Sequence, residues 1–302
     1  MSSQHWFFDS HSFQPSSEQL HFLLSILPSD VKTKVTKFKA LKDQKLSLIS
    51  ALIQRAMVRE VFKCSNQDFV IKRSSMNKPF ASSDTFATHE WNYNVSHHGS
   101  YVTILSNANR PIGVDLVQRS VRKSWKQSAT KYITQFTGQL TYSEQAACLK
   151  QSKEWQQYTH FFIIWSLKEA YIKAVGKGLY MDLLSISFEV KFSALSVDGA
   201  AGTAIVKIDD RERPDWEFAF SSLDSEHVVT VAKGPGAKRE HTAESGAAAL
   251  DTSHRPVQVK ILDLLSPDDQ LQWMSMDDVP YFKETAAPGS AATIPAAEAA
   301  SQ

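Results

Sequence analysis

The sequence predicts an α+β (α/β) protein made of two similar halves. Three observations support this prediction: a helical pattern is followed by strand patterns before about residue 118, the same order recurs after it, and 302 residues can bury two cores of ordinary size. Beyond the second half, the composition shifts to small and charged residues. The predicted segments are an N-terminal half (1–118), a C-terminal half (119–232), a flexible linker (233–255), a segment that packs back (256–282) and a disordered tail (283–302).

The N-terminal half carries one clear helix and several short strands. Apolar residues recur at helical spacing after a lysine-rich run that includes Lys34 and Lys45, and such a run is mostly a solvated face. Alternation and β-branched residues mark the strands, and Gly99 interrupts residues 91–105, which form either a hairpin or a bulged strand pair. The predicted elements are a helix over 43–62, a strand at 69–71, a turn over 74–79, a strand pair over 91–105 and a buried strand over 111–117.

The C-terminal half follows the same plan. The Gly-x-Gly at 176–178 marks the end of its strongest helical pattern, and Ser143 is a candidate N-cap of a shorter helix. After the linker, residues 257–262 alternate like an edge strand, and Trp273 and Phe282 could pack back onto the body. The predicted elements are helices over 125–136, 143–150 and 161–175, and strands over 184–192, 204–208, 216–220 and 227–232.

Composition and charge limit the classes of function. The chain is 42% apolar and 22% charged, as in a globular protein, and its net charge of +1 creates no overall field for nucleic acid or an anionic membrane. Two cysteines cannot build a disulfide framework, no run of eighteen apolar residues occurs, and the N-terminus lacks a secretory signal pattern. We therefore expect a cytoplasmic (cytosolic) protein without a nucleic-acid or membrane partner.

The first of three motifs is NVSHHG at residues 94–99. Successive side chains on a strand point to opposite faces, so His97 and His98 cannot chelate one metal together, but one of them can face a pocket. An imidazole beside Ser96 and Gly99 suits a phosphate or a hydroxyl group. A pair of surface histidines is the alternative interpretation.

The second motif is GVD at residues 113–115, inside the predicted buried strand. An acid among apolar neighbours is costly unless it is ion-paired, hydrogen-bonded or bound to a cation. Mg²⁺ binds through one or two carboxylates and completes its shell with phosphate and water oxygens. Asp115 is therefore either a magnesium ligand or one half of a buried ion pair with Arg110 or Arg119.

The third motif is WSLKEAYIKAVGKGL at residues 165–179. Trp165, Glu169 and Ile172 recur at helical spacing, which places Glu169 on a partly apolar face. Glu169 and Lys173 are one helical turn apart, so they are neighbours. The two are either a metal-binding carboxylate with a lysine that neutralises phosphate oxygens, or a solvated salt bridge.

These three motifs, in this order, resemble the 4′-phosphopantetheinyl transferases of the large, pseudo-dimeric type. That family carries Ser-His, Gly-hydrophobic-Asp and Trp-x-x-Lys-Glu-x-x-x-Lys segments, and this chain matches each of them. The likeness covers most of residues 20–232 and, more weakly, 256–282, and it is greatest to the animal members. The resemblance implies a pseudo-dimer of two similar halves with coenzyme A and the active site in the cleft between them.

The resemblance also implies roles for individual residues. Asp115 and Glu169 match the Mg²⁺ ligands of the family, and both belong to its catalytic set. Lys173 matches the third catalytic residue, which stabilises the phosphate under attack. The positions that match coenzyme A contacts are Ser96 and His97, with Asn94 beside them, for the phosphates, and Arg73, Lys78 and Lys34 for the nucleotide or its 3′-phosphate.

The implied activity is that of a holo-acyl-carrier-protein synthase. A serine of an apo acyl carrier protein would attack the β-phosphate of coenzyme A, giving the holo-carrier and adenosine 3′,5′-bisphosphate. The implied partners are carrier domains of the fatty acid synthase and aminoadipate-semialdehyde dehydrogenase types, docked on basic residues of 119–131. The enzyme is expected to be a monomer with pseudo-twofold symmetry.

One position departs from the family pattern, and two other functions fit the same residues. Bacterial members often have a third acid two residues after the aspartate, where this chain has Val117, so its metal affinity is in question. A Mg²⁺-dependent phosphohydrolase or nucleotidyl transferase could use the same two acids without a pocket for the pantetheine arm. An inactive coenzyme A-binding regulator is the other alternative, and Val117 is its only support.

Overall fold

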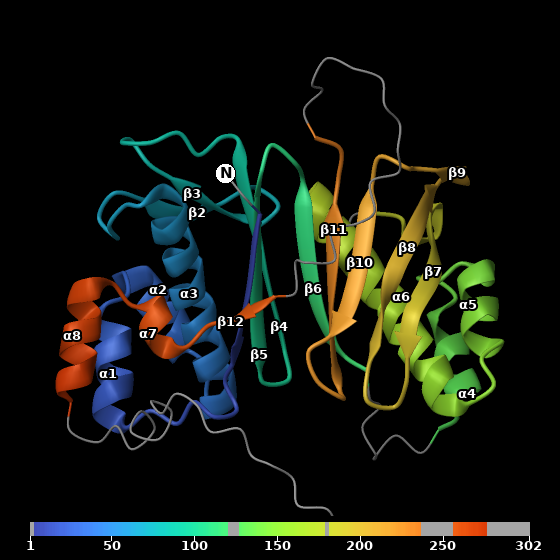
Figure 1. Cartoon of the computed structure of the whole chain (residues 1–302), viewed down its shortest axis with the longest axis horizontal. Coiled ribbons are helices and arrows are strands. Elements are labelled where there is room, and N and C mark those ends of the chain that lie inside the picture. The colour runs from blue at the N-terminus through green and yellow to red at the C-terminus, as the bar shows by residue number, and fades with distance from the viewer. Residues whose placement is uncertain (1–2, 120–126, 179–180, 237–255, 277–302) are drawn as a thin grey trace, which may run out of the picture.

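The computed structural model describes residues 3–119, 127–178, 181–236 and 256–276, which form two sheets and a separate hairpin (Figure 1). In Figure 1 the two sheets stand side by side in the middle of the molecule, and helices lie on both outer sides. This mixture of helices and mainly antiparallel strands confirms the predicted α+β class. A true repeat relation between the halves stays a prediction. Among the described residues, no helix has the length and apolar character needed to cross a bilayer.

The first half builds a sheet covered by helices on one side. Its elements are β1 (Gln4–Asp9), α1 (Ser17–Ser25), α2 (Ser29–Thr36), α3 (Leu41–Phe62), β2 (Val70–Arg73), β3 (Pro79–Ser82), β4 (Trp91–His98) and β5 (Tyr101–Ala108). Strand β5 lies between β1 and β4, and β2 pairs with β3. Leu23, Ile49 and Val102 share one core, so the helices and the sheet are packed together. The predicted hairpin is confirmed, with Gly99 at its turn.

The second half builds the larger sheet, with strand order β6-β11-β10-β8-β7 and β9 paired to β8. Its elements are β6 (Ile112–Gln118), α4 (Ala129–Ile133), the 3₁₀ helix η1 (Thr134–Phe136), α5 (Tyr142–Leu149), α6 (Glu154–Val175), the 3₁₀ helix η3 (Leu183–Ser185), β7 (Ile186–Leu195), β8 (Ala200–Ile208), β9 (Arg211–Glu212), β10 (Glu217–Ser222) and β11 (His227–Lys233). Helix α6 packs on this sheet through Leu167 and Ala170, which share a core with Phe218 and Val228.

Strand β6 belongs to the second sheet, although the sequence analysis placed its residues at the end of the first half. It pairs antiparallel with β11, with Asp115 opposite Thr230. The chain passes from one sheet to the other at Asn109, which has a φ of +62°, and Pro111. Pairing with a strand more than a hundred residues later is a long-range feature that the local pattern of β6 does not reveal.

The C-terminal segment returns to the first half. It contains β12 (Val257–Gln258), α7 (Ile261–Leu264) and α8 (Pro267–Ser275), and β12 runs parallel to β1. Trp273 is 3% exposed and contacts Phe22, which confirms that it packs back. The predicted edge strand over 257–262 is wrong beyond Gln258, because Asp263 accepts a hydrogen bond from the Lys260 backbone N–H at 2.7 Å and starts a helix. Phe282, residues 237–255 of the linker and the tail lie outside the described residues.

Three further predictions need correction. Helix α5 is capped by Thr141 instead of Ser143, because Thr141 and Glu144 form a reciprocal capping box. Helix α6 begins at Glu154, before the predicted start at 161, and Gln157 stabilises this polar first part by donating hydrogen bonds to two backbone carbonyls. Lys45 does not lie on a solvated face, since it is 7% exposed and donates to the Phe13 carbonyl at 2.7 Å.

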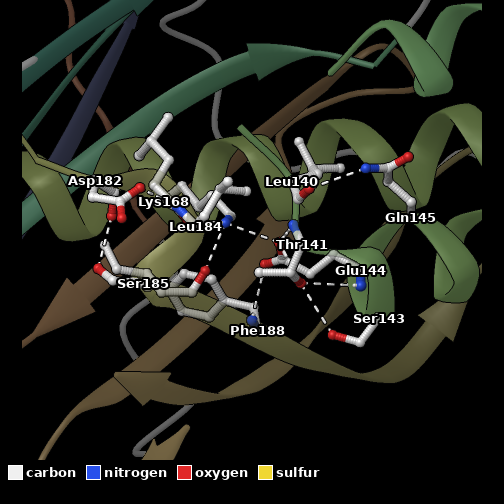
Figure 2. Close-up of polar contacts among 12 residues, drawn as sticks. Leu140, Thr141, Ser143, Glu144, Gln145, Lys168, Asp182, Leu184, Ser185 and Phe188 are labelled. Carbon is white, nitrogen blue, oxygen red and sulfur yellow. Dashed lines mark hydrogen bonds and ion pairs between the residues drawn. The ribbon is translucent and has the colours of Figure 1, made fainter. Parts of the chain in front are cut away.

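A buried ion pair ties α6 to the rest of the second half (Figure 2). Lys168 Nζ lies 2.9 Å from Glu144 Oε2, and both side chains are almost fully buried. The same Nζ donates to the Leu183 and Ile186 carbonyls at 2.7 Å, and Glu144 Oε1 accepts from the Phe188 N–H at 3.0 Å. The pair therefore fixes α5 and the start of β7 against the helix that carries the third motif.

We predict that Lys168→Met lowers the free energy of unfolding by about 3–5 kcal/mol, because it leaves the Glu144 carboxylate buried without its charge partner. Urea unfolding followed by circular dichroism measures the change. The double variant Lys168→Met, Glu144→Gln removes the isolated charge and is expected to recover part of the loss. A single variant as stable as the wild type would contradict the prediction.

Candidate functional site

A cavity of about 480 Å³ lies where β4, β6 and α6 meet. All three motifs of the sequence contribute to its wall, although they are separated by up to about eighty positions. A second cavity, of about 330 Å³, lies beside Arg119 and Trp155 and is lined by none of the predicted site residues. The first cavity is lined by Val95, Ser96, His97, His98, Asp115, Leu116, Val117, Trp165, Glu169 and Lys173.

Side chains of β4 bind the free edge of β6 and hold the two strands together. Asn94 Oδ1 accepts a hydrogen bond from the Val114 N–H at 2.9 Å, and Ser96 Oγ accepts one from the Leu116 N–H at 3.3 Å. The edge of β6 is thus satisfied by side chains instead of by a neighbouring backbone. Asn94 is buried and acts as a bridge between the halves, whereas Ser96 also reaches the cavity.

Asp115 is held by three side chains. Lys173 Nζ lies 2.7 Å from Asp115 Oδ1, and Ser96 Oγ donates to the same oxygen at 3.2 Å. Ser166 Oγ donates to Asp115 Oδ2 at 2.9 Å. A partly buried ion pair is therefore present. One interpretation of the sequence expected a buried ion pair at Asp115, but the cation is Lys173 from the third motif instead of Arg110 or Arg119.

The two arginines that the sequence suggested as partners of Asp115 bind elsewhere. Arg110 Nη2 lies 2.8 Å from Glu217 Oε1, and its Nε donates to the Gly234 carbonyl. Arg119 is 6% exposed and donates to the Ser225 carbonyl at 2.7 Å and to two further carbonyls. Arg119 is consequently not available as part of a basic docking surface.

Gly113 explains how Lys173 reaches Asp115. A Cβ at position 113 would lie 1.9 Å from the Ala170 carbonyl oxygen and 2.7 Å from the Ala174 nitrogen, both of them backbone atoms of α6. The absence of a side chain lets the helix lie directly on the strand. At this separation Lys173 bonds to Asp115, and the salt bridge with Glu169, which was one of the two interpretations of the third motif, is not the bond that Lys173 makes.

Glu169 lies in the same cavity and is half-buried. Burial, and next the negative charge of Asp115, raise the pKa of Glu169, while Lys173 lowers it less strongly. Two carboxylates that affect each other in one cavity form a donor set for a hard cation. Mg²⁺ needs only one or two protein carboxylates, because phosphate and water oxygens complete its shell. Within the described residues, no three His, Cys, Asp or Glu side chains form a metal cluster.

Both histidines of the first motif line the cavity, which corrects the expectation that only one of them could face a pocket. Strand β4 is the last strand of the first sheet, and the cavity lies along its outer edge, near the end of the strand. Side chains from both faces of the sheet can reach the cavity there. Both histidine side chains are still exposed to solvent on one side. Partial desolvation by the surrounding protein, and next the positive charge of Lys173, lower the pKa of His97. Partial desolvation also lowers the pKa of His98. Both rings are therefore neutral at physiological pH and can donate or accept a hydrogen bond.

Three predicted nucleotide contacts lie outside the wall of the cavity. Lys34 is exposed on α2, with Nζ 3.5 Å from Asp30. Arg73 donates to the Asn77 carbonyl at 2.9 Å. Lys78 Nζ lies 3.4 Å from the Ala174 carbonyl oxygen, at the C-terminal end of α6, and burial lowers its pKa.

Sequence reasoning missed Ser166, although a signal for it exists. Ser166, Glu169 and Lys173 are spaced i, i+3 and i+7, so they share one face of α6. A small polar residue on the same helical face as two functional residues is a candidate for contact with them. His98, in contrast, lines the cavity because of where the cavity meets β4. No local pattern in the sequence predicts this.

Comparisons with known proteins show sequence similarity over both halves of the chain. A family model described as 4′-phosphopantetheinyl transferase, N-terminal, matches residues 11–109, and one described as 4′-phosphopantetheinyl transferase superfamily matches residues 111–232. The L-aminoadipate-semialdehyde dehydrogenase-phosphopantetheinyl transferase of Xenopus laevis is 25% identical, over 93% of this chain and 95% of its own length. A phosphopantetheinyl transferase of Thraustochytrium sp. is 29% identical, over 74% and 73%. A 4′-phosphopantetheinyl transferase of Aneurinibacillus migulanus is 27% identical, over 55% and 62%.

We predict that Glu169→Gln raises the melting temperature at about pH 8. The pKa of Glu169 is higher in the folded protein than in the unfolded chain, so ionisation of this group destabilises the fold above its folded pKa. The penalty disappears below the ordinary glutamate pKa of about 4.3, where the group is protonated in both states. Melting curves of wild type and variant should therefore converge toward about pH 4, and a difference that is the same at both pH values would contradict this account.

Proposed function

Because this chain belongs to the 4′-phosphopantetheinyl transferase superfamily, whose members transfer phosphopantetheine to carrier proteins, we propose that its cavity between β4, β6 and α6 is the active site. The observation that supports this proposal is the meeting of Asp115, Glu169 and Lys173 with Ser96 and His97 in one cavity. These are the residues at which the family resemblance implies catalysis and phosphate binding. The proposed activity is that of a holo-acyl-carrier-protein synthase with coenzyme A as co-substrate.

We assign the Mg²⁺ site of the proposed enzyme to Asp115 and Glu169. The donor set fits, because the two acids share the cavity and Mg²⁺ requires only one or two protein carboxylates. When bound, the ion would offset the charge of the diphosphate oxygens of coenzyme A. Val117 has no side-chain oxygen at the position where bacterial members often have a third acid, and a water would fill this site.

The remaining side chains would bind and orient the diphosphate. Lys173 is partly exposed in the cavity wall, and its three ammonium donors reach Asp115 Oδ1, Ser96 Oγ and, at 3.3 Å, the Val114 carbonyl. It would bind a phosphate oxygen in place of the longest of these bonds while it keeps Asp115. The neutral ring of His97 can donate to another phosphate oxygen. Arg73, Lys78 and Lys34 remain our candidates for the nucleotide, at sites around the first half and the end of α6.

Glu169 is our candidate for the general base. Its raised pKa makes it a better proton acceptor than an ordinary surface glutamate. The serine Oγ of the carrier would attack the β-phosphorus, its proton would pass to Glu169, and the bond from phosphorus to adenosine 3′,5′-bisphosphate would break. No covalent enzyme intermediate is needed.

The carriers of the fatty acid synthase and aminoadipate-semialdehyde dehydrogenase types remain the proposed partners. The relatives from animals carry the name of the second type, which supports this choice. Of the basic residues first considered for docking, Arg119 is buried and Lys131 is exposed on α4, while the others lie outside the described residues. A cytosolic location and a monomeric state stay predictions.

We predict that Asp115→Asn lowers transfer by roughly 100-fold or more, because the amide has the shape of the carboxylate but loses the charge. Its oxygen can still accept from Ser96, and its NH2 group can donate to the Ser166 hydroxyl. The assay follows labelled phosphopantetheine from coenzyme A to an apo acyl carrier protein, with and without Mg²⁺. The control is Glu189→Gln, an exposed acid on β7, which should transfer like the wild type.

Normal transfer by Asp115→Asn, or transfer by the wild type that does not depend on Mg²⁺, would overturn the assignment of the site. Release of adenosine 3′,5′-bisphosphate without a carrier, and without any carrier modification, would instead support a phosphohydrolase.

A further inference from the structure

His227 connects the second sheet to the turn at Gly99, where the first motif ends. It is the first residue of β11, is 6% exposed, and meets the Tyr101 ring edge-on with centroids 4.9 Å apart. A Cβ on Gly99 would lie 2.1 Å from His227 Nε2. The imidazole therefore occupies the space that any side chain at position 99 would need.

Asp224 fixes the orientation of this imidazole. Its carboxylate oxygens lie 3.0 and 3.1 Å from His227 Nδ1, and one of them also accepts from the His227 backbone N–H at 2.6 Å. Burial raises the pKa of Asp224, but hydrogen bonds from the Glu226 and His227 N–H groups outweigh it, so the net shift is downward. An ionised carboxylate only accepts hydrogen bonds, so Nδ1 is the donor and Nε2 faces Gly99.

The turn is held from two sides. Ser10, just after β1, donates to the Ser100 carbonyl through both its N–H at 2.7 Å and its Oγ at 2.6 Å. On the other side lies His227, whose Nε2 is buried and has no hydrogen-bond partner among the described residues. A buried ring nitrogen without a partner is costly, which indicates that the ring is kept there by Asp224 and by packing against the turn.

The position of this turn determines where the cavity-lining histidines lie. His97 and His98 immediately precede Gly99, at the end of β4, and both are in the cavity wall. Gly99 has a φ of +62°, a conformation that favours glycine, so the turn also depends on its backbone. Displacing Gly99 from His227 would move both imidazoles relative to Asp115 and Lys173.

We propose that Asp224 and His227 are a positioning pair that holds the Gly99 turn so that His97 and His98 can bind the phosphates of coenzyme A. This inference rests on the proposed function, because that function assigns the cavity to coenzyme A. His227 touches the turn and not the substrate, so its role is to position other residues. His227 thus links the start of β11 in the second sheet to the end of β4 in the first sheet, where His97 and His98 lie.

The test uses Gly99→Asn in the full chain. Asparagine tolerates a positive φ, so the variant separates the collision with His227 from backbone strain. We expect the KM for coenzyme A to rise roughly 10-fold or more and kcat to stay within about twofold. The double variant Gly99→Asn, His227→Ala removes the collision, and the asparagine side chain takes the space of the missing ring against the turn, so the variant should recover most of the KM.

The matched control is Gly138→Asn. No atom of the described residues lies within 4 Å of a Cβ added at Gly138, which is not part of any of the three motifs, so the same substitution there meets no obstacle. Its KM for coenzyme A should stay at the wild-type value. Loss of folded enzyme alone would lower kcat and leave KM unchanged, so the KM separates positioning from a general loss of structure.

A second readout needs no substrate. With ¹³C-labelled histidine, the ring signals of His97 and His98 in the free enzyme should shift in Gly99→Asn and return toward wild-type positions in the double variant. These signals would still respond if the wild type transferred no phosphopantetheine, so failure of the proposed function and failure of this inference are distinguishable.

Unchanged KM and unchanged ring signals in Gly99→Asn would overturn the proposal, and so would a double variant that behaves like the single one. If circular dichroism shows that Gly99→Asn does not fold, His227→Ala decides alone. It is expected to raise the KM and shift both ring signals, and wild-type behaviour in both measurements would overturn the proposal.

Discussion

The backbone contact between α6 and β6 at Gly113 is the constraint on which the cavity depends. The Ala170 carbonyl and the Ala174 nitrogen leave no room for a side chain on the strand at this point. The helix therefore lies close enough for Lys173 and Ser166 to reach Asp115. A contact that contains no functional group thus sets the distances among the groups that carry the chemistry.

The two acids of the cavity have different surroundings. Both oxygens of Asp115 accept hydrogen bonds from side chains, and one of them also has the ammonium group of Lys173 beside it. Burial and the charge of Asp115 instead raise the pKa of Glu169. Different environments for two neighbouring carboxylates are a common way to give one an electrostatic role and the other a role in proton transfer.

The sequence predicts the fold class and five residues of the cavity wall because their signals are local. Glu169 and Lys173 are brought to one side by the helical period, and Asp115 stands out as an acid in an apolar strand. The partner of Asp115 could not be predicted in this way, because it depends on how closely α6 approaches β6. The same holds for the sheet to which β6 belongs, since its partner β11 lies more than a hundred residues later.

Helices α1 and α8 are not among the predicted elements, although the sequence carries local signals for both. Ser16 and Gln19 form a capping box that starts α1, and Pro267 follows the cap of α8.

Lys45 and Lys34 belong to the same lysine-rich run, yet Lys45 is buried and donates to a backbone carbonyl, whereas Lys34 is exposed. Their difference comes from the Phe13 segment that passes over α3, which composition does not reveal.

The return of the last described segment to the first half has a consequence for biosynthesis. Val259, Leu264 and Trp273 complete the core that α1, α3 and the first sheet begin, and β12 covers the outer edge of β1 (Figure 1). A ribosome releases these residues only after both halves have been translated. The domain made first is therefore finished last, whereas the larger sheet has all its strands once residue 233 has emerged.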